Sequence, residues 1–125
     1  MSVKNYKEYS EAYSSIEIEI ILAKGEYGKF INIKENNELY YHIYFNDNKE
    51  EIKNKYKIDE KDKVTKIKII IDYQVKSLKK LFYDCECIES INYKKFYRNN
   101  ITDMGWMHSY CSSLKELNVQ QVLIR

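Results

Sequence analysis

The sequence predicts an α+β fold, in which an N-terminal helix and an antiparallel β-sheet are followed by two units of an internal repeat. Tyrosines recur at helical spacing near the N-terminus, and isoleucines then alternate with charged residues. In the second half, apolar positions match one another at an offset of 26 residues, as Val75 and Ile101 do. We therefore assign residues 1–72 to the helix and sheet, and residues 73–125 to two units at about 75–100 and 101–125.

Composition and charge narrow the class of protein. A chain of 125 residues is about the size of one domain. Its net charge of +2 lacks the clustered basic excess of nucleic-acid-binding proteins, so we expect no nucleic-acid partner. No apolar run is long enough to span a membrane, and no signal peptide is visible. Three cysteines suit a reducing compartment. These features predict a cytoplasmic protein, or a surface or secreted one if the chain is a fragment.

The first expected element is a short amphipathic helix over residues 4–15. Tyr6, Tyr9 and Tyr13 lie three or four residues apart, with charged residues between them. Such a tyrosine face predicts a surface that docks on the rest of the domain.

Four strands are expected next. Ile16, Ile18 and Ile20 alternate with glutamates, which is the period of a half-buried strand. Asn36 and Asn37 favour a tight hairpin because asparagine tolerates positive φ. The mixed charges of residues 46–63 predict a solvated loop or a surface helix. The expected strands cover residues 16–20, 29–34, 39–45 and 64–71, with Leu39, Tyr41, Ile43 and Phe45 on one face of the third.

The repeat rests on eight matched pairs, six of which are apolar in an unbroken series. The period lies within the 20–29 residues typical of leucine-rich repeats. The pairs are Val75 and Ile101, Leu78 and Met104, Leu81 and Met107, Cys85 and Cys111, Ile88 and Leu114, Ile91 and Leu117, Asn92 and Asn118, and Phe96 and Val122.

Each unit is expected to contain a helical turn followed by a short strand. In residues 102–111, Met104, Met107 and Cys111 fall on one helical face, and residues 114–119 read L-x-x-L-x-V. Matching apolar positions would then form ladders between stacked coils. A pair of ordinary helix–strand hairpins is the alternative.

Residues 101–119, ITDMGWMHSYCSSLKELNV, resemble the BspA-like leucine-rich repeat, whose pattern is V-T-x-M-x-x-M-F-x-x-C-x-S-L-x-x-L-x-L. The resemblance covers roughly residues 75–122 and is specific at the Met-Met-Cys-Leu-Leu positions; His108 replaces the usual aromatic residue. It implies two stacked leucine-rich-repeat-like coils and a non-enzymatic scaffold or adhesion role in protein–protein recognition. It supplies no catalytic residues and no cofactor.

The residues between the apolar positions of each strand should point outward and line up on a shared surface. A solvated face without a partner is the alternative. The predicted partner-binding residues are Ser90, Asn92, Lys94, Glu116, Asn118 and Gln120.

The chain has few candidates for chemistry. Cys85, Cys87, Cys111 and His108 offer a zinc ligand set, which makes a structural zinc module one alternative function. However, C-x-C is not the usual knuckle spacing, and a free cysteine in a core ladder packs as a small hydrophobe. We therefore expect no metal, with Cys85 and Cys111 buried and reduced and Cys87 more accessible. A cysteine–histidine nucleophile pair, with His42 or His108, lacks any marked orienting group.

The basic and aromatic residues 93–98 give a nucleic-acid-binding module some support, since stacking platforms combine both kinds of side chain. In the repeat register, however, Tyr93 and Phe96 are core positions, so a structural role is expected.

The last expectation concerns the final unit. A terminal repeat exposes the face that a further repeat would cover. Residues 114–124 therefore predict a contact with a partner or a symmetric homodimer. The alternative is that Leu123 and Ile124 fold back over their own unit.

Overall fold

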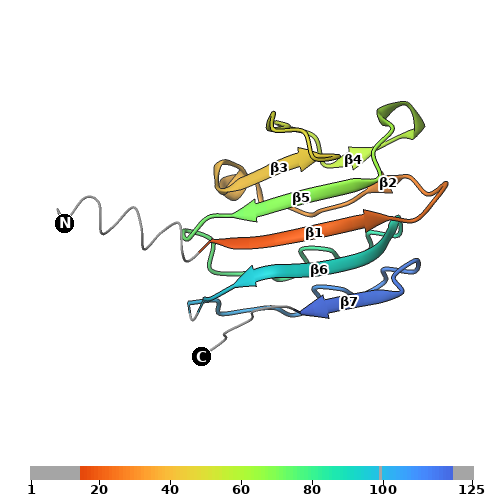
Figure 1. Ribbon diagram of the computed structural model, residues 1–125. Helices are drawn as coiled ribbons and strands as arrows, with labels where there is room; N and C mark the ends of the chain where they lie inside the picture. Colours follow the sequence, from red (N-terminus) through yellow and green to blue (C-terminus); the bar gives the residue numbers. More distant parts are fainter. Residues whose placement is uncertain (1–14, 99, 120–125) are drawn as a thin grey trace.

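The computed structural model describes residues 15–98 and 100–119. Over these ranges the chain forms one mixed five-stranded sheet in the order β3-β5-β1-β6-β7 (Figure 1). Two-residue strands β2 (Gly28–Lys29) and β4 (Lys57–Ile58) pair separately, and η1 (Glu35–Tyr40) and η2 (Glu60–Asp62) are short 3₁₀ helices. The strands of the large sheet are β1 (Ile16–Leu22), β3 (Tyr41–Phe45), β5 (Lys66–Ile71), β6 (Ile88–Phe96) and β7 (Glu116–Val119).

The predicted α+β fold class is therefore wrong. The described chain is mostly β, and its only helical segments are η1 and η2. The sheet is mixed rather than antiparallel, because β7 runs parallel to β6. Residues 78–85 and 102–111 form turns instead of helices, so the expected arrangement of stacked leucine-rich-repeat-like coils is not what the structure shows. Except for Ser15, the helix expected over residues 4–15 lies outside the described residues.

β1 is the central strand, and its alternation holds as predicted. Ile16, Ile18 and Ile20 are completely buried, and the glutamates between them are half-buried on the opposite face. β1 pairs antiparallel with β5 on one side and with β6 on the other, so both halves of the chain contribute to one sheet. The isoleucines of β5 lie directly opposite those of β1 and complete the apolar face.

Loops cover this apolar face, crossing behind the sheet in the view of Figure 1. The expected strand over residues 29–34 is wrong, because only Lys29 belongs to a strand. Phe30 and Ile31 are both buried although they are consecutive, which a strand with one buried face does not allow. The next residue, Asn32, donates its amide to the carbonyl of Leu81 at 2.8 Å. The buried residues of the loop layer are Phe30, Ile31, Val75, Leu78, Leu81, Phe82, Cys85, Cys87 and Met107.

The expected asparagine hairpin is also wrong. Asn36 and Asn37 lie in η1, where neither residue has a positive φ. Leu39 belongs to the same 3₁₀ helix and is 84% exposed, so the third strand begins only at Tyr41. Tyr41, Ile43 and Phe45 are buried on one face of β3, as predicted.

The 26-residue offset appears in the strand register. Ser90 of β6 lies opposite Glu116 of β7, and the pairing continues without a shift to Tyr93 and Val119. An isolated parallel bridge joins Ser77 to Asp103 at the same offset. The two matched segments therefore lie side by side in register, although neither has the predicted internal structure.

Positive φ angles explain why the two matched segments turn rather than coil into helices. Lys80 and Asp84 have φ near +60°, and so do Trp106 and Tyr110, which lie 26 residues further on. A left-handed residue every fourth position interrupts the i to i−4 hydrogen bonds of a helix. The amides bond three residues back instead, as Tyr83 does to Lys80 and Ser109 to Trp106.

Candidate interaction surface

The two edges of the five-stranded sheet differ. At the β3 edge, Ile52 donates its amide to the carbonyl of Ile43 at 2.8 Å, so residues beyond β3 partly cover that strand. At the other edge, β7 pairs with β6 and with no other strand of the described chain (Figure 1). An unpaired edge presents amide and carbonyl groups to which a further strand can bond.

Apolar side chains of β7 are exposed where their counterparts in β6 are buried. Ile91 and Tyr93 are 0% and 4% exposed, whereas their partners Leu117 and Val119 are 47% and 59% exposed. These side chains have the apolar character of a core ladder but no covering layer among the described residues. β7 thus ends the sheet with an uncovered apolar surface.

The two turn segments, the first at residues 78–85 and the second at residues 102–111, add a row of hydrogen bonds beside the paired strands. The amides of Leu78, Lys80, Phe82 and Asp84 donate to the carbonyls of Asp103, Gly105, Met107 and Ser109, at 2.8–2.9 Å. These four bonds run in one direction, from the first segment to the second. Directly before them, the amide of Thr102 donates in the opposite direction to the carbonyl of Lys76 at 2.7 Å. The row thus begins like a ladder between parallel strands, but its four following donors all come from one segment.

The equivalent donors of the second segment have no acceptor in the described chain. By the 26-residue register these are the amides of Met104, Trp106, His108 and Tyr110, and none of them makes a hydrogen bond among the described residues. We call this set the donor row. It continues the uncovered surface from β7 onto the neighbouring turn segment.

Two exposed aromatic side chains flank the donor row. Trp106 and Tyr110 are 59% and 67% exposed and occupy the positions that Lys80 and Asp84 hold in the first segment. Both residues have left-handed backbone geometry. Exposed large aromatic residues are enriched at protein interfaces. We define the end surface as Met104, Trp106, Tyr110, Leu117 and Val119 together with the donor row.

Four of the six predicted partner-binding residues, Ser90, Asn92, Glu116 and Asn118, form a hydrogen-bonded row beside this surface. Asn118 donates to the side chain of Asn92 at 2.6 Å, and Asn92 donates to Ser90 Oγ at 2.9 Å. Ser90 is buried, whereas Glu116 and Asn118 are exposed. Lys94 falls at the register shift between β1 and β6, where it has no opposing residue in β1. Gln120 lies outside the described residues, and the binding role of the set stays a prediction.

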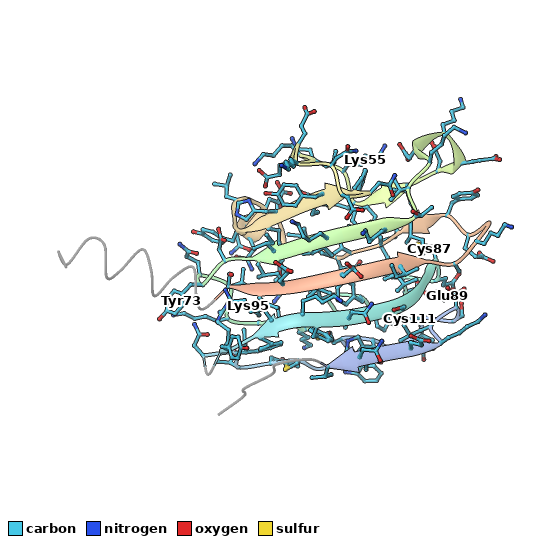
Figure 2. The ribbon with its side chains drawn as sticks, in the orientation of Figure 1. Lys55, Tyr73, Cys87, Glu89, Lys95 and Cys111 are labelled. Carbon is cyan, nitrogen blue, oxygen red and sulfur yellow. The ribbon has the colours of Figure 1, made fainter. Side chains whose placement is uncertain are left out.

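The sulfur and imidazole groups do not converge into a reactive site. Cys85 and Cys87 are buried, so the expectation that Cys87 is the more accessible cysteine is wrong; Cys111 is only half-buried. Figure 2 shows Cys87 at the start of β6 and Cys111 beside β7. Burial raises the pKa of Cys85 to about 12, which keeps it a protonated thiol.

His108 also fails to complete a nucleophile pair. Its Nε2 lies 2.6 Å from the hydroxyl of Tyr93, and its ring stacks on Phe82. Burial lowers its pKa, so the ring is neutral at physiological pH. Within the described residues, no group of three or more histidine, cysteine or acidic side chains is placed to hold a metal ion. Tyr93 and Phe96 are core residues, as predicted.

One feature that the sequence pattern does not reveal is a histidine of β3, His42, held between two carboxylates. His42 Nδ1 lies 2.5 Å from Glu51, and its Nε2 lies 2.8 Å from Asp72. Burial alone would lower the pKa of His42, but its hydrogen bonds to the two carboxylates outweigh burial and raise it. The carboxylates come from distant parts of the chain, so no local spacing could indicate them. This arrangement stabilises the imidazolium and leaves no ring nitrogen free to take a proton.

One described hollow, of about 570 Å³, lies between residues 22–27 and 60–65. Its lining carries both acidic and basic side chains, among them Glu26, Glu60 and Lys63, but no histidine or cysteine. It therefore offers no cysteine–histidine nucleophile pair.

Comparisons of the chain with protein-family models, with curated proteins and with solved structures find no match. In the described part of the chain, no helix is long and apolar enough to cross a membrane.

Proposed function

We propose that this chain is a non-enzymatic protein–protein interaction module that binds its partner at the end surface. The observation that carries the proposal is the contrast between matched positions in β6 and β7. Ile91 and Tyr93 of β6 are buried, while their β7 partners Leu117 and Val119 are about half exposed. Large apolar side chains grouped beside an unpaired strand are typical of surfaces that a second polypeptide covers.

The likeness of residues 101–119 to BspA-like repeats supports the same class of function, since that resemblance implies protein recognition, scaffolding or adhesion. The predicted residues Asn92, Glu116 and Asn118 lie on one face of β6 and β7 and would form a polar rim beside the apolar contact. A polar rim around an apolar centre is the usual arrangement of an interface.

A symmetric homodimer through residues 114–124 is the second candidate for covering the edge. An exposed edge strand can pair with its own copy, because an antiparallel contact between two β7 strands matches donors with acceptors.

The test compares two aspartate substitutions at exposed leucines. Leu117→Asp places a charge in the end surface, whereas Leu39→Asp places one in η1, far along the sheet order from β7. Each tagged protein is used to capture partners from extracts of its native cell, and captured proteins are quantified by mass spectrometry. We expect a partner retained by the unmodified chain and by Leu39→Asp, and reduced at least tenfold by Leu117→Asp.

Circular dichroism and urea unfolding establish that both variants are folded. Equal retention by all three proteins, or no specific protein retained by the unmodified chain, would contradict the proposal.

A further inference from the structure

We propose that the partner adds a strand parallel to β7 and directs a row of main-chain carbonyl oxygens at the amides of Met104, Trp106, His108 and Tyr110. This inference rests on the proposed function and specifies the chemistry of the partner. It also selects against a two-fold contact between copies of this chain.

The first step is the equivalence of two surfaces. The side of residues 78–93 that faces β7 is covered by residues 102–119, through a parallel strand and a row of four carbonyls. The end surface carries the same two elements in the same register: β7 replaces β6, and the donor row replaces the amides of Leu78, Lys80, Phe82 and Asp84. A ligand that fits the first surface therefore has the geometry to fit the second.

The second step is the polarity of the turn segments. The carbonyls of Asp103, Gly105, Met107 and Ser109 all bond back to the first segment, so they are not available at the end surface. What this part of the end surface offers is a set of donors. Its partner must supply acceptors at the same spacing, and main-chain carbonyls along an extended or turning segment do so.

The third step concerns a second copy of the chain. Two-fold symmetry brings identical patches together, so the donor row of one copy would face the donor row of the other. Buried amides opposed to amides remain without acceptors, which is strongly unfavourable. The strands alone could pair in this arrangement, but the turn segments could not.

A head-to-tail arrangement of two copies is disfavoured as well. By the 26-residue register it would need the carbonyls of Ser77, Lys79, Leu81 and Tyr83, and Asn32 already donates to those of Leu81 and Tyr83. Its main-chain amide donates to Leu81, and its side chain donates to Lys80 and Tyr83, at 2.8–3.0 Å. The occupant is therefore a different polypeptide segment that presents its own carbonyl row.

The probe for this geometry is a second copy of the segment that already covers the equivalent side of residues 78–93. In the test variant, residues 94–119 are inserted again after Val119 and followed by residues 120–125. Position 120 corresponds to Lys94 in the 26-residue register, so the insert continues that register. It carries copies of the four acceptor carbonyls of Asp103, Gly105, Met107 and Ser109. The control has an insert of equal length made of glycine and serine.

Amide exchange measured by NMR reports on the donor row in both proteins. We expect exchange at Met104, Trp106, His108 and Tyr110 to slow at least tenfold with the repeated segment relative to the glycine–serine control. Exchange rates equal to those of the control would overturn the proposal.

Two measurements on the unmodified chain complete the test. Light scattering at tens of micromolar is expected to give a monomer, with the donor row exchanging much faster than the paired amides of Leu78, Lys80, Phe82 and Asp84. A monomer in which both rows exchange equally slowly would overturn the inference, because the donor row would not be free. A dimer that protects the donor row would overturn it too, while leaving the proposed role of the end surface in place.

Discussion

Arg98 offers the most direct test of what holds the sheet and the loop layer together. Its side chain is only 2% exposed, and its guanidinium donates to the main-chain carbonyls of Asp72, Tyr73 and Val75. Its Nε also donates to Asn100 at 2.6 Å. One side chain at the end of β6 thus ties the turn that follows β5 to the segment that leads toward β7.

The expected effect of Arg98→Met follows from these bonds. The hydrogen bond that the Val75 carbonyl accepts from Arg98 is buried. Leaving a buried carbonyl without a donor costs about 1–3 kcal/mol. The bonds to Asp72 and Tyr73 are only part-buried, so water can replace the donor and each contributes about 0.5–1 kcal/mol. The sum predicts a loss of about 2–5 kcal/mol from the free energy of unfolding.

Urea unfolding followed by circular dichroism measures this loss. Arg98→Lys should be less damaging than Arg98→Met, because an ammonium keeps the charge and can still donate to a carbonyl. It should be more damaging than no substitution, because an ammonium cannot fork across several carbonyls. Lys24→Met, at an exposed position, serves as the control and should change stability by less than ~0.5 kcal/mol. An Arg98→Met protein as stable as that control would refute the account.

Two further predictions concern titratable groups. The raised pKa of His42 means that folding favours its imidazolium; this stabilisation is complete below the ordinary pKa of 6.5 and is lost as pH rises through the higher folded-state value. The free energy of unfolding should therefore fall as the pH rises above 6.5 in the unmodified chain and change less in His42→Gln, and an equal slope in both would contradict this. For the cysteines, a thiol reagent at neutral pH should label Cys111 first, since Cys85 and Cys87 are buried. Mass spectrometry of the unmodified chain and of Cys111→Ser would show whether a fast-reacting thiol remains, which would contradict the burial of the other two.

The sequence predicts strands well where burial alternates along the chain. Residues 16–20 and 64–71 alternate, and both lie within or around strands of the central sheet. It fails where burial depends on distant segments. Phe30 is buried with its ring against Phe45 and its amide bonded to the carbonyl of Tyr56, and no local period records these distant contacts. Lys80, Trp106 and Tyr110 also have positive φ although their residue types do not favour it, so the sequence gives no sign of these turns.

The internal repeat predicts which segments lie side by side, whereas periodicity predicts the conformation within a segment. The 26-residue offset correctly aligns Ser90 with Glu116 and Tyr93 with Val119 across two parallel strands. It led to the wrong internal structure, because Met104, Met107 and Cys111 are spaced as in a helix but lie in turns. An offset reports which segments are equivalent, and equivalent segments can pair in register whatever their backbone conformation.

The same equivalence separates the part of the surface that could be predicted from the part that could not. Leu117 matches the buried Ile91, so the pattern identifies a side chain suited to a core but does not say whether this chain covers it. Only the edge position of β7 shows that the described chain leaves it exposed. Trp106 and Tyr110, in contrast, depart from the repeat, since the first segment has Lys80 and Asp84 there. Charged side chains such as Lys80 and Asp84 are stable when exposed to water. Large aromatic side chains at the matching positions, Trp106 and Tyr110, gain free energy when another surface covers them. The residues that break the repeat therefore indicate the interface as strongly as those that keep it.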